Sequence, residues 1–60
     1  MIDFVFVTMN PGFVSFNASS QGVTRRTGSD PAHTPEERLT ILERLRTDFP
    51  EAQFQFRREF

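Results

Sequence analysis

The chain has 60 residues, of which 37% are hydrophobic and eight are Phe, and its formal net charge is −1. It contains no Cys, which excludes disulfide bonds, thiolate metal sites and cysteine nucleophiles, and its charge gives no bulk attraction to nucleic acid or to an anionic membrane. A core of this size supplies only about 3–5 kcal/mol of stability unless something reinforces it, and self-association is the reinforcement that this composition leaves.

The sequence predicts one cytoplasmic domain that covers residues 1–60. The longest apolar run, Phe4–Val7, is far shorter than the ~20 residues that a membrane span requires. Met1 is followed directly by the apolar segment, without a basic stretch or a cleavage-site pattern, so we expect no signal peptide.

Residues 2–9 predict a β-strand, because β-branched and aromatic side chains dominate this segment. Alternation gives the strand two apolar faces, one with Ile2, Phe4 and Phe6 and the other with Val5, Val7 and Met9. A strand of this kind is usually covered on both sides, and one helix can cover only one face of a sheet. We therefore predict that the helix covers the Phe face, and that a second copy of the chain covers the Val5, Val7 and Met9 face in a homodimer.

A hairpin and a further strand are expected next. Pro11 and Gly12 suit the two central positions of a turn, because Pro presets φ and Gly accepts a positive φ. Residues 13–17 then predict the returning strand of the hairpin. We also predict a third strand at residues 23–27, and the alternative is that residues 18–33 form a loop.

The start of a helix is the clearest local signal. Thr34 suits the N-cap, Pro35 the first helical position and Glu37 the third, which together form a capping box. Pro50 disfavours helical geometry at the residue before it, so the helix is predicted over residues 35–48. Its apolar side chains fall in one arc, which consists of Leu39, Ile41, Leu42, Leu45 and Phe49.

The C-terminal segment alternates between apolar and polar residues over residues 51–59, which predicts a half-buried strand. The fold class is therefore α+β: a small antiparallel sheet, built as a β-hairpin or a three-strand meander, plus one helix and a C-terminal strand, in the order ββ(β)αβ. The predicted centre of the core beneath the helix comprises Phe4, Phe6, Leu42, Leu45, Phe54 and Phe56.

Two arginine doublets, Arg25–Arg26 and Arg57–Arg58, are the candidate partner-binding residues. Each doublet places one guanidinium on each face of its strand, so the four groups could gather if the third and last strands lie near each other. Such a cluster would bind phosphate or carboxylate groups. The alternative is that these charges are solvated and paired locally. Arg38 interrupts the apolar arc of the helix, and either extends past the core edge or pairs with a carboxylate at an interface.

Nothing in the sequence predicts catalysis, a cofactor or a metal site. His33 is the only histidine, and we interpret it as a loop residue beside the start of the helix. The three Gly residues are isolated, so no glycine-rich phosphate loop is present. The chain is therefore not expected to be an enzyme.

The order of elements resembles that of small antitoxin domains with a partial RNase-H topology. The βββα portion is similar to the three-stranded DNA-binding domains of some integrases, and neither likeness includes a shared motif. We expect a non-catalytic interaction protein that docks onto a protein partner as an inhibitor, antitoxin or phage-type accessory protein, and acts as a homodimer. The alternative is a β-sheet nucleic-acid-binding protein that uses the two arginine doublets.

Overall fold

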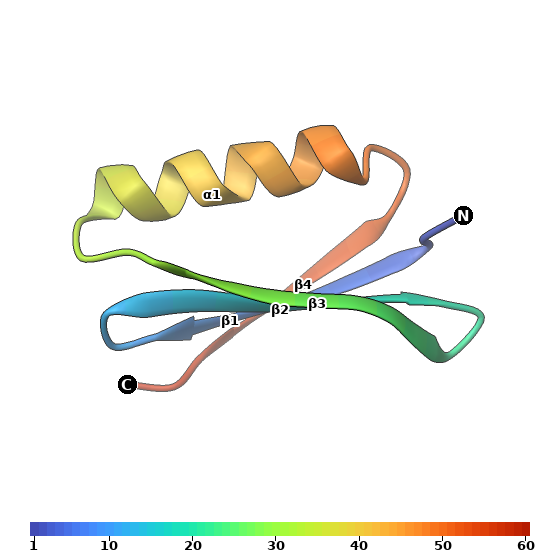
Figure 1. The fold of residues 1–60 in the computed structure, drawn as a ribbon, viewed down its shortest axis with the longest axis horizontal. Coiled ribbons are helices and arrows are strands. Elements are labelled where there is room, and N and C mark those ends of the chain that lie inside the picture. Colours follow the sequence, from blue (N-terminus) through green and yellow to red (C-terminus); the bar gives the residue numbers. More distant parts are fainter.

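The computed structural model describes residues 1–60 as one sheet covered by one helix (Figure 1). The elements follow the order βββαβ: β1 (Phe4–Asn10), β2 (Phe13–Ser20), β3 (Val23–Pro31), α1 (Pro35–Asp48) and β4 (Gln53–Arg58). Across the sheet the strands lie in the order β3-β2-β1-β4. The first three strands are antiparallel neighbours, whereas β4 returns beneath the helix and pairs parallel to β1. Figure 1 shows α1 above one face of the sheet, with the opposite face uncovered.

The predicted fold class is confirmed, including the optional third strand. The strand predicted at residues 23–27 is β3, which continues to Pro31, so residues 18–33 do not form a loop. The helix spans Pro35–Asp48, as the capping and proline signals predicted. The last strand is shorter than predicted, because the turn after the helix continues to residue 52.

Both hairpin turns use residues that tolerate a left-handed backbone. Gly12 has a φ of +80° in the first turn, and Gln21 and Gly22 have φ values of 53° and 81° in the second. Two consecutive positive φ values are typical of the two-residue turns that match the twist of paired strands. The turn at Pro11–Gly12 joins β1 to β2 directly, since Asn10 pairs with Phe13.

The start of α1 forms the predicted capping box. The backbone N–H of Glu37 donates to the Thr34 hydroxyl at 3.2 Å, and the Thr34 backbone N–H donates to the Glu37 carboxylate at 3.0 Å. The His33 backbone N–H donates to the same carboxylate oxygen at 2.8 Å. These bonds occupy backbone donors that no helical carbonyl can reach.

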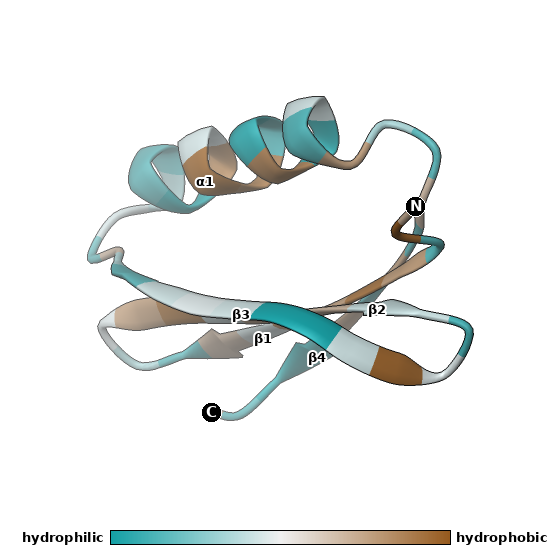
Figure 2. Ribbon diagram, turned by 45° about the vertical axis from the view of Figure 1, so that its right-hand side comes forward, coloured by the Kyte–Doolittle hydropathy of each residue, from teal (hydrophilic) through white to brown (hydrophobic).

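The core lies between α1 and the valine face of β1, which corrects the predicted assignment of faces. Val5 and Val7 are fully buried within the single chain, and Met9 packs against the same cluster. The buried residues are Val5, Val7, Val14, Ala18, Ala32, Ile41, Leu45 and Phe49. Figure 2 agrees with this arrangement, because the side of α1 that faces the sheet is brown and its outer side is teal.

The predicted core centre is correspondingly only partly right. Leu45 is buried, and Leu42 and Phe54 are half-buried against the core, whereas Phe56 is 44% exposed. Phe4 and Phe6 lie on the opposite, uncovered face of the sheet, with their rings 6.5 Å apart. The surface of Val5, Val7 and Met9 is therefore not free to bind a second copy of the chain.

The register of the first hairpin explains which face is inside. The two-residue turn places Met9 opposite Val14, Val7 opposite Phe16 and Val5 opposite Ala18. The valine face of β1 therefore continues into the apolar face of β2. The Phe face of β1 meets the polar face of β2, where Asn17 and Ser19 lie. The helix covers the side on which both strands are apolar, because burial there removes more apolar surface from water.

The helix α1 is neither long enough nor apolar enough to span a membrane.

Candidate docking surface

The structure does not bring the two arginine doublets together. Strands β3 and β4 lie at opposite edges of the sheet, so three strand spacings, about 14 Å, separate them. Arg26 pairs with Ala18 near the start of β1, whereas Arg58 pairs with Met9 near its end. The doublets therefore occupy diagonally opposite corners, and the predicted four-arginine cluster is not formed.

The members of the doublets have separate surroundings. Arg25 lies at a register shift of β3, between the residues that pair with Ala18 and Ser19. Arg57 lies on the uncovered face and forms a salt bridge with Glu59, at 3.3 Å between Nε and Oε2. Only Arg26 and Arg58 lie on the helix side, and each stacks on a different Phe ring.

A surface that combines apolar and basic side chains lies between α1 and β4. We call it the α1–β4 groove. Arg38, Leu39, Leu42, Arg58 and Phe60 line its open end, and Arg46, Phe54 and Phe56 continue it along the same side of β4. Its open end holds a cavity of about 290 Å³ lined by residues that include Arg38, Leu39 and Phe60. Leu39 and Phe60 are 57% and 65% exposed, so large apolar side chains remain in contact with water here.

Arginine side chains stack on Phe rings along this groove. The guanidinium carbons of Arg38 and Arg58 lie 5.5 and 5.4 Å from the ring centre of Phe60, and that of Arg46 lies 5.9 Å from that of Phe54. A fourth such pair joins Arg26 and Phe49, outside the groove. Three of the four pairs therefore lie in the groove, and two of them share the Phe60 ring.

Arg38 is half-buried at the edge of the core and contacts the end of β1, and its pairing with a carboxylate at an interface stays a prediction. Its Nη2 donates to the carbonyl oxygen of Asn10 at 2.7 Å, and its Nη1 lies 3.8 Å from the Met9 sulfur. The half-buried side chain thus connects the start of α1 to the end of β1, and its guanidinium lies over the Phe60 ring.

The charges of the groove have no acidic partner within the chain. The two salt bridges of the molecule join Arg44 to Asp30 and Arg57 to Glu59, and neither involves Arg38, Arg46 or Arg58. Arg44 projects from the other side of α1, toward β3. The groove therefore carries three positive charges without a salt bridge, although the whole chain has a net charge of −1.

The outer edge of β4 offers unpaired backbone groups beside the groove. Gln53 and Glu59 donate their backbone N–H groups to the carbonyls of Asp3 and Met9, at 3.0 and 2.9 Å. Because backbone groups alternate in direction along a strand, those of the even-numbered residues of β4 point away from β1. These residues are Phe54, Phe56 and Arg58, whose side chains also lie on the groove side.

The two edges of the sheet differ in their protection. Edge strand β3 contains a register shift and Pro31, both of which discourage pairing with another chain. Edge strand β4 has a regular register with β1 and contains no Pro and no Gly. The free edge of β4 is therefore the one suited to accept a further strand.

The uncovered face of the sheet is a second exposed surface. We call it the open sheet face; its apolar side chains are Phe4, Phe6 and Phe13, and the last of these is 42% exposed. Neutral polar side chains surround them, among them Asn17, which accepts a hydrogen bond from the Thr24 hydroxyl at 3.2 Å. Arg57 also lies on this face, where it is paired with Glu59.

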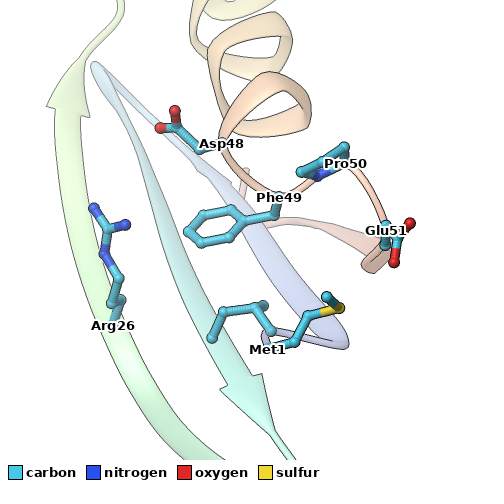
Figure 3. Close-up of a pocket in the computed structure, with 7 residues that line it drawn as sticks. Met1, Arg26, Asp48, Phe49, Pro50 and Glu51 are labelled. Carbon is cyan, nitrogen blue, oxygen red and sulfur yellow. The ribbon is translucent and has the colours of Figure 1, made fainter.

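A cavity of about 330 Å³ lies at the other end of α1. Figure 3 shows Phe49 reaching toward the sheet, with Arg26 on β3 to its left and Met1 below it. The guanidinium carbon of Arg26 is 5.4 Å from the centre of the Phe49 ring. Arg26, Asp48 and Glu51 all line the cavity, so residues of both charges surround it and favour no one class of ligand.

The acidic side chains and His33 are dispersed over the molecule. No three His, Asp or Glu residues are grouped closely enough to hold a metal ion. The backbone N–H groups of His33 and Thr34, which donate to the Glu37 carboxylate, hold the pKa of Glu37 below its ordinary value. The capping box accounts for this shift, so it does not indicate an acid or base in catalysis.

No family model, curated protein or solved structure matches this chain.

Two residues of the groove stand out in the sequence, because each is a charged residue on an otherwise apolar face. Arg38 interrupts the apolar arc of the helix, and Arg58 interrupts the apolar face of the last strand. The structure places both over Phe60, at the same end of the groove. The four-residue spacing of Arg38, Leu42 and Arg46 gave a further signal, because residues at this spacing share one side of a helix.

Proposed function

We propose that this chain is a non-catalytic interaction protein that binds a protein partner in the α1–β4 groove. The observation that carries the proposal is the combination of exposed apolar side chains and arginines without a salt bridge beside a free strand edge. Protein interfaces are enriched in aromatic residues and Arg, and a few such anchors provide most of their binding energy. Phe56, Phe60 and Arg58 are the anchors of this groove.

The biological role that we propose is that of a small cytoplasmic inhibitor, antitoxin or phage-type accessory protein, which acts by occupying a surface of its partner. We further propose that it works as a homodimer. Because Val5 and Val7 are buried within the chain, the proposed self-association surface is the open sheet face. Phe4, Phe6 and Phe13 lie there, and a twofold pairing would remove their exposed apolar surface from water.

A nucleic-acid-binding role for the arginine doublets receives less support. The doublets lie at opposite corners of the sheet, and Arg57 is already paired with Glu59. Bases that stack on Phe4 and Phe6 would therefore find Arg57, which lies on the same face, already engaged by a carboxylate and less able to neutralise their phosphates.

Capture of the partner from the native host with an immobilised chain tests the proposed function. Two variants remove groove anchors, Phe56→Thr and Arg58→Gln, and two matched controls change residues outside the groove, Val23→Thr and Arg44→Gln. Val23 is 51% exposed, and the Arg44 side chain is 53% exposed on the side of α1 that faces β3. The two controls therefore make comparable apolar-to-Thr and Arg-to-Gln substitutions outside the groove.

The account expects that a specific protein is captured by the parent and by both controls, and that the groove variants lose it. Loss of the protein in the controls, or its retention by both groove variants, would contradict the assignment of the surface. Retention of nucleic acid in a salt-sensitive manner would contradict the class of partner.

A further inference from the structure

We infer that the occupant of the α1–β4 groove is an extended acidic segment that adds to β4 as a fifth strand, with an acid–x–apolar–x–acid pattern. This inference rests on the proposed function and names the partner of the same surface. It combines three features of the groove, which are the direction of the free backbone groups, the positions of the arginines and the exposed Phe56.

The backbone of β4 selects an extended occupant. The outward N–H and C=O groups belong to Phe54, Phe56 and Arg58, whose side chains lie on the groove side. A strand that pairs with these groups places every second side chain of its own on that same side. The occupant therefore presents alternate residues to the helix and to the rings of β4.

The positions of the arginines set the spacing of the acidic residues. Arg46 lies over Phe54 at one end of the groove, and Arg38 and Arg58 both lie over Phe60 at the other. Arg38 and Arg46 are eight residues apart on α1, which corresponds to about 12 Å along the helix. Two residues of a strand that are four positions apart are separated by about 13 Å and point to the same side. Acids with this spacing meet both basic ends at once.

Phe56 determines the residue between the two acids. It lies midway between Phe54 and Arg58 on β4, its ring is stacked near that of Phe54 with centroids 6.3 Å apart, and it is 44% exposed. The cross-strand neighbour of an exposed aromatic ring is most favourable when it is β-branched or aromatic. The central groove-facing residue of the occupant is therefore apolar.

A second copy of the chain fits this edge poorly. Pairing of β4 with its own copy would bring Arg38, Arg46 and Arg58 of the two molecules to one side of a joint sheet. No carboxylate of the groove offsets these charges, since both salt bridges of the chain lie elsewhere. Like charges that face each other across strands are destabilising, whereas an acidic strand converts the same arginines into bidentate pairs.

The direct test uses a synthetic peptide with the central sequence Glu-Thr-Val-Thr-Glu, titrated into the isotopically labelled chain. We expect chemical-shift changes that centre on residues 54–58 and on the Arg38 and Arg46 side chains. A control peptide with the same composition, Thr-Glu-Val-Glu-Thr, places its two Glu side chains on the face of the strand opposite to Val. We expect it to bind at least about tenfold more weakly, because it loses charge-assisted hydrogen bonds to the groove arginines.

Two N-methylated peptides test whether the occupant is a strand. One carries the methyl group on the central Val and the other on the preceding Thr. Only one of two successive amides in a strand points to its neighbour, so we expect one peptide to lose binding and the other to keep it. Equal behaviour of the two would overturn the proposed strand pairing.

Protein variants test the contribution of the charges. The double variant Arg46→Gln and Arg58→Gln should lower the affinity for the Glu-Thr-Val-Thr-Glu peptide by about tenfold or more. Arg44→Gln with Arg26→Gln removes the same charge outside the groove and should leave the affinity within about twofold, since distant exposed charges are screened. Equal effects of the two double variants would overturn the inference, as would absence of binding at millimolar peptide.

The outcome also separates this inference from the proposed function. If no acidic peptide binds but the captured partner still depends on Phe56 and Arg58, the groove is the docking surface and its occupant is not an acidic strand. If the peptide binds and no protein is captured through the groove, the proposed function fails on its own test. Binding of single-stranded oligonucleotide in place of the peptide, at the same residues, would overturn the inference.

Discussion

Gly28 lies directly across from Phe16 in the β2–β3 pairing, and the Phe16 ring occupies the space that a Gly28 side chain would need. A Cβ atom at Gly28 would come within 2.6 Å of Cε1 of Phe16, which is closer than such atoms approach. The Phe16 ring itself packs toward Phe49, with centroids 6.2 Å apart, so it cannot move away freely. The absence of a side chain at Gly28 therefore permits the contact between β2 and the end of α1.

The first prediction follows from this contact. Gly28→Ala should lower the free energy of unfolding by about 1–3 kcal/mol, because it overpacks a well-filled site. Chemical denaturation measures the change, and the exposed neighbour Thr27→Ala serves as control, with an expected effect within about 0.5 kcal/mol. Phe16→Leu in the Gly28→Ala background should recover part of the loss. Strictly additive effects of the two substitutions would show that the two sites do not interact.

The second prediction concerns the capping box and acid pH. Hydrogen bonds from the backbone N–H groups of His33 and Thr34 lower the pKa of Glu37 in the folded chain. A carboxylate with a lowered folded-state pKa contributes stability above its ordinary pKa of about 4.3, and this contribution is lost as the pH falls through the lowered value. The stability difference between the parent and Glu37→Gln should therefore be largest at neutral pH and shrink below about pH 4.

Denaturation of both proteins at a series of pH values checks this dependence. Glu36→Gln is the control, because it removes an exposed acid from the same first turn that does not take part in the capping box. A parent–variant difference that stays constant into strong acid would mean that the Glu37 charge does not stabilise the start of α1.

The third prediction concerns self-association through the open sheet face. Sedimentation of the parent at micromolar concentration should give twice the chain mass of 7.0 kDa. Phe6→Thr should shift the equilibrium toward the monomer, because Phe6 lies in the centre of the apolar patch and Thr preserves the preference for strand. Val23→Thr, on β3 outside this patch, should leave the dimer intact. Sedimentation of the parent as a monomer throughout the micromolar range would rule out the dimer.

The sequence predicted the elements better than it predicted the face that they bury. Turn and cap signals at Pro11, Gly12, Thr34 and Pro50 are local, and the boundaries that depend on them agree with the structure. The inner face of β1 depends instead on β2, because both faces of β1 are apolar. Combining the two-residue turn with the polar positions Ser15 and Asn17 of β2 would have identified the valine face as the inner one.

The site was harder to predict for a related reason. The four arginines of the doublets could be grouped only on the assumption that β3 and β4 are neighbours, and the parallel pairing of β4 with β1 places them at opposite edges. The groove depends on that same long-range pairing, since it joins Arg38 and Arg46 on α1 to Phe54 and Phe56 on β4. No local pattern fixes a parallel pairing of this kind.

The measurement that tests the central claim most directly is amide hydrogen exchange along β4, in the free chain and in complex with its partner or the Glu-Thr-Val-Thr-Glu peptide. In the free chain the amides of Phe54, Phe56 and Arg58 should exchange faster than those of Gln55 and Arg57, because they point to the free edge. Binding should protect some or all of these fast amides, while the amide of Phe6 changes little. Unchanged exchange at Phe54, Phe56 and Arg58 in a saturated complex would contradict docking on this edge.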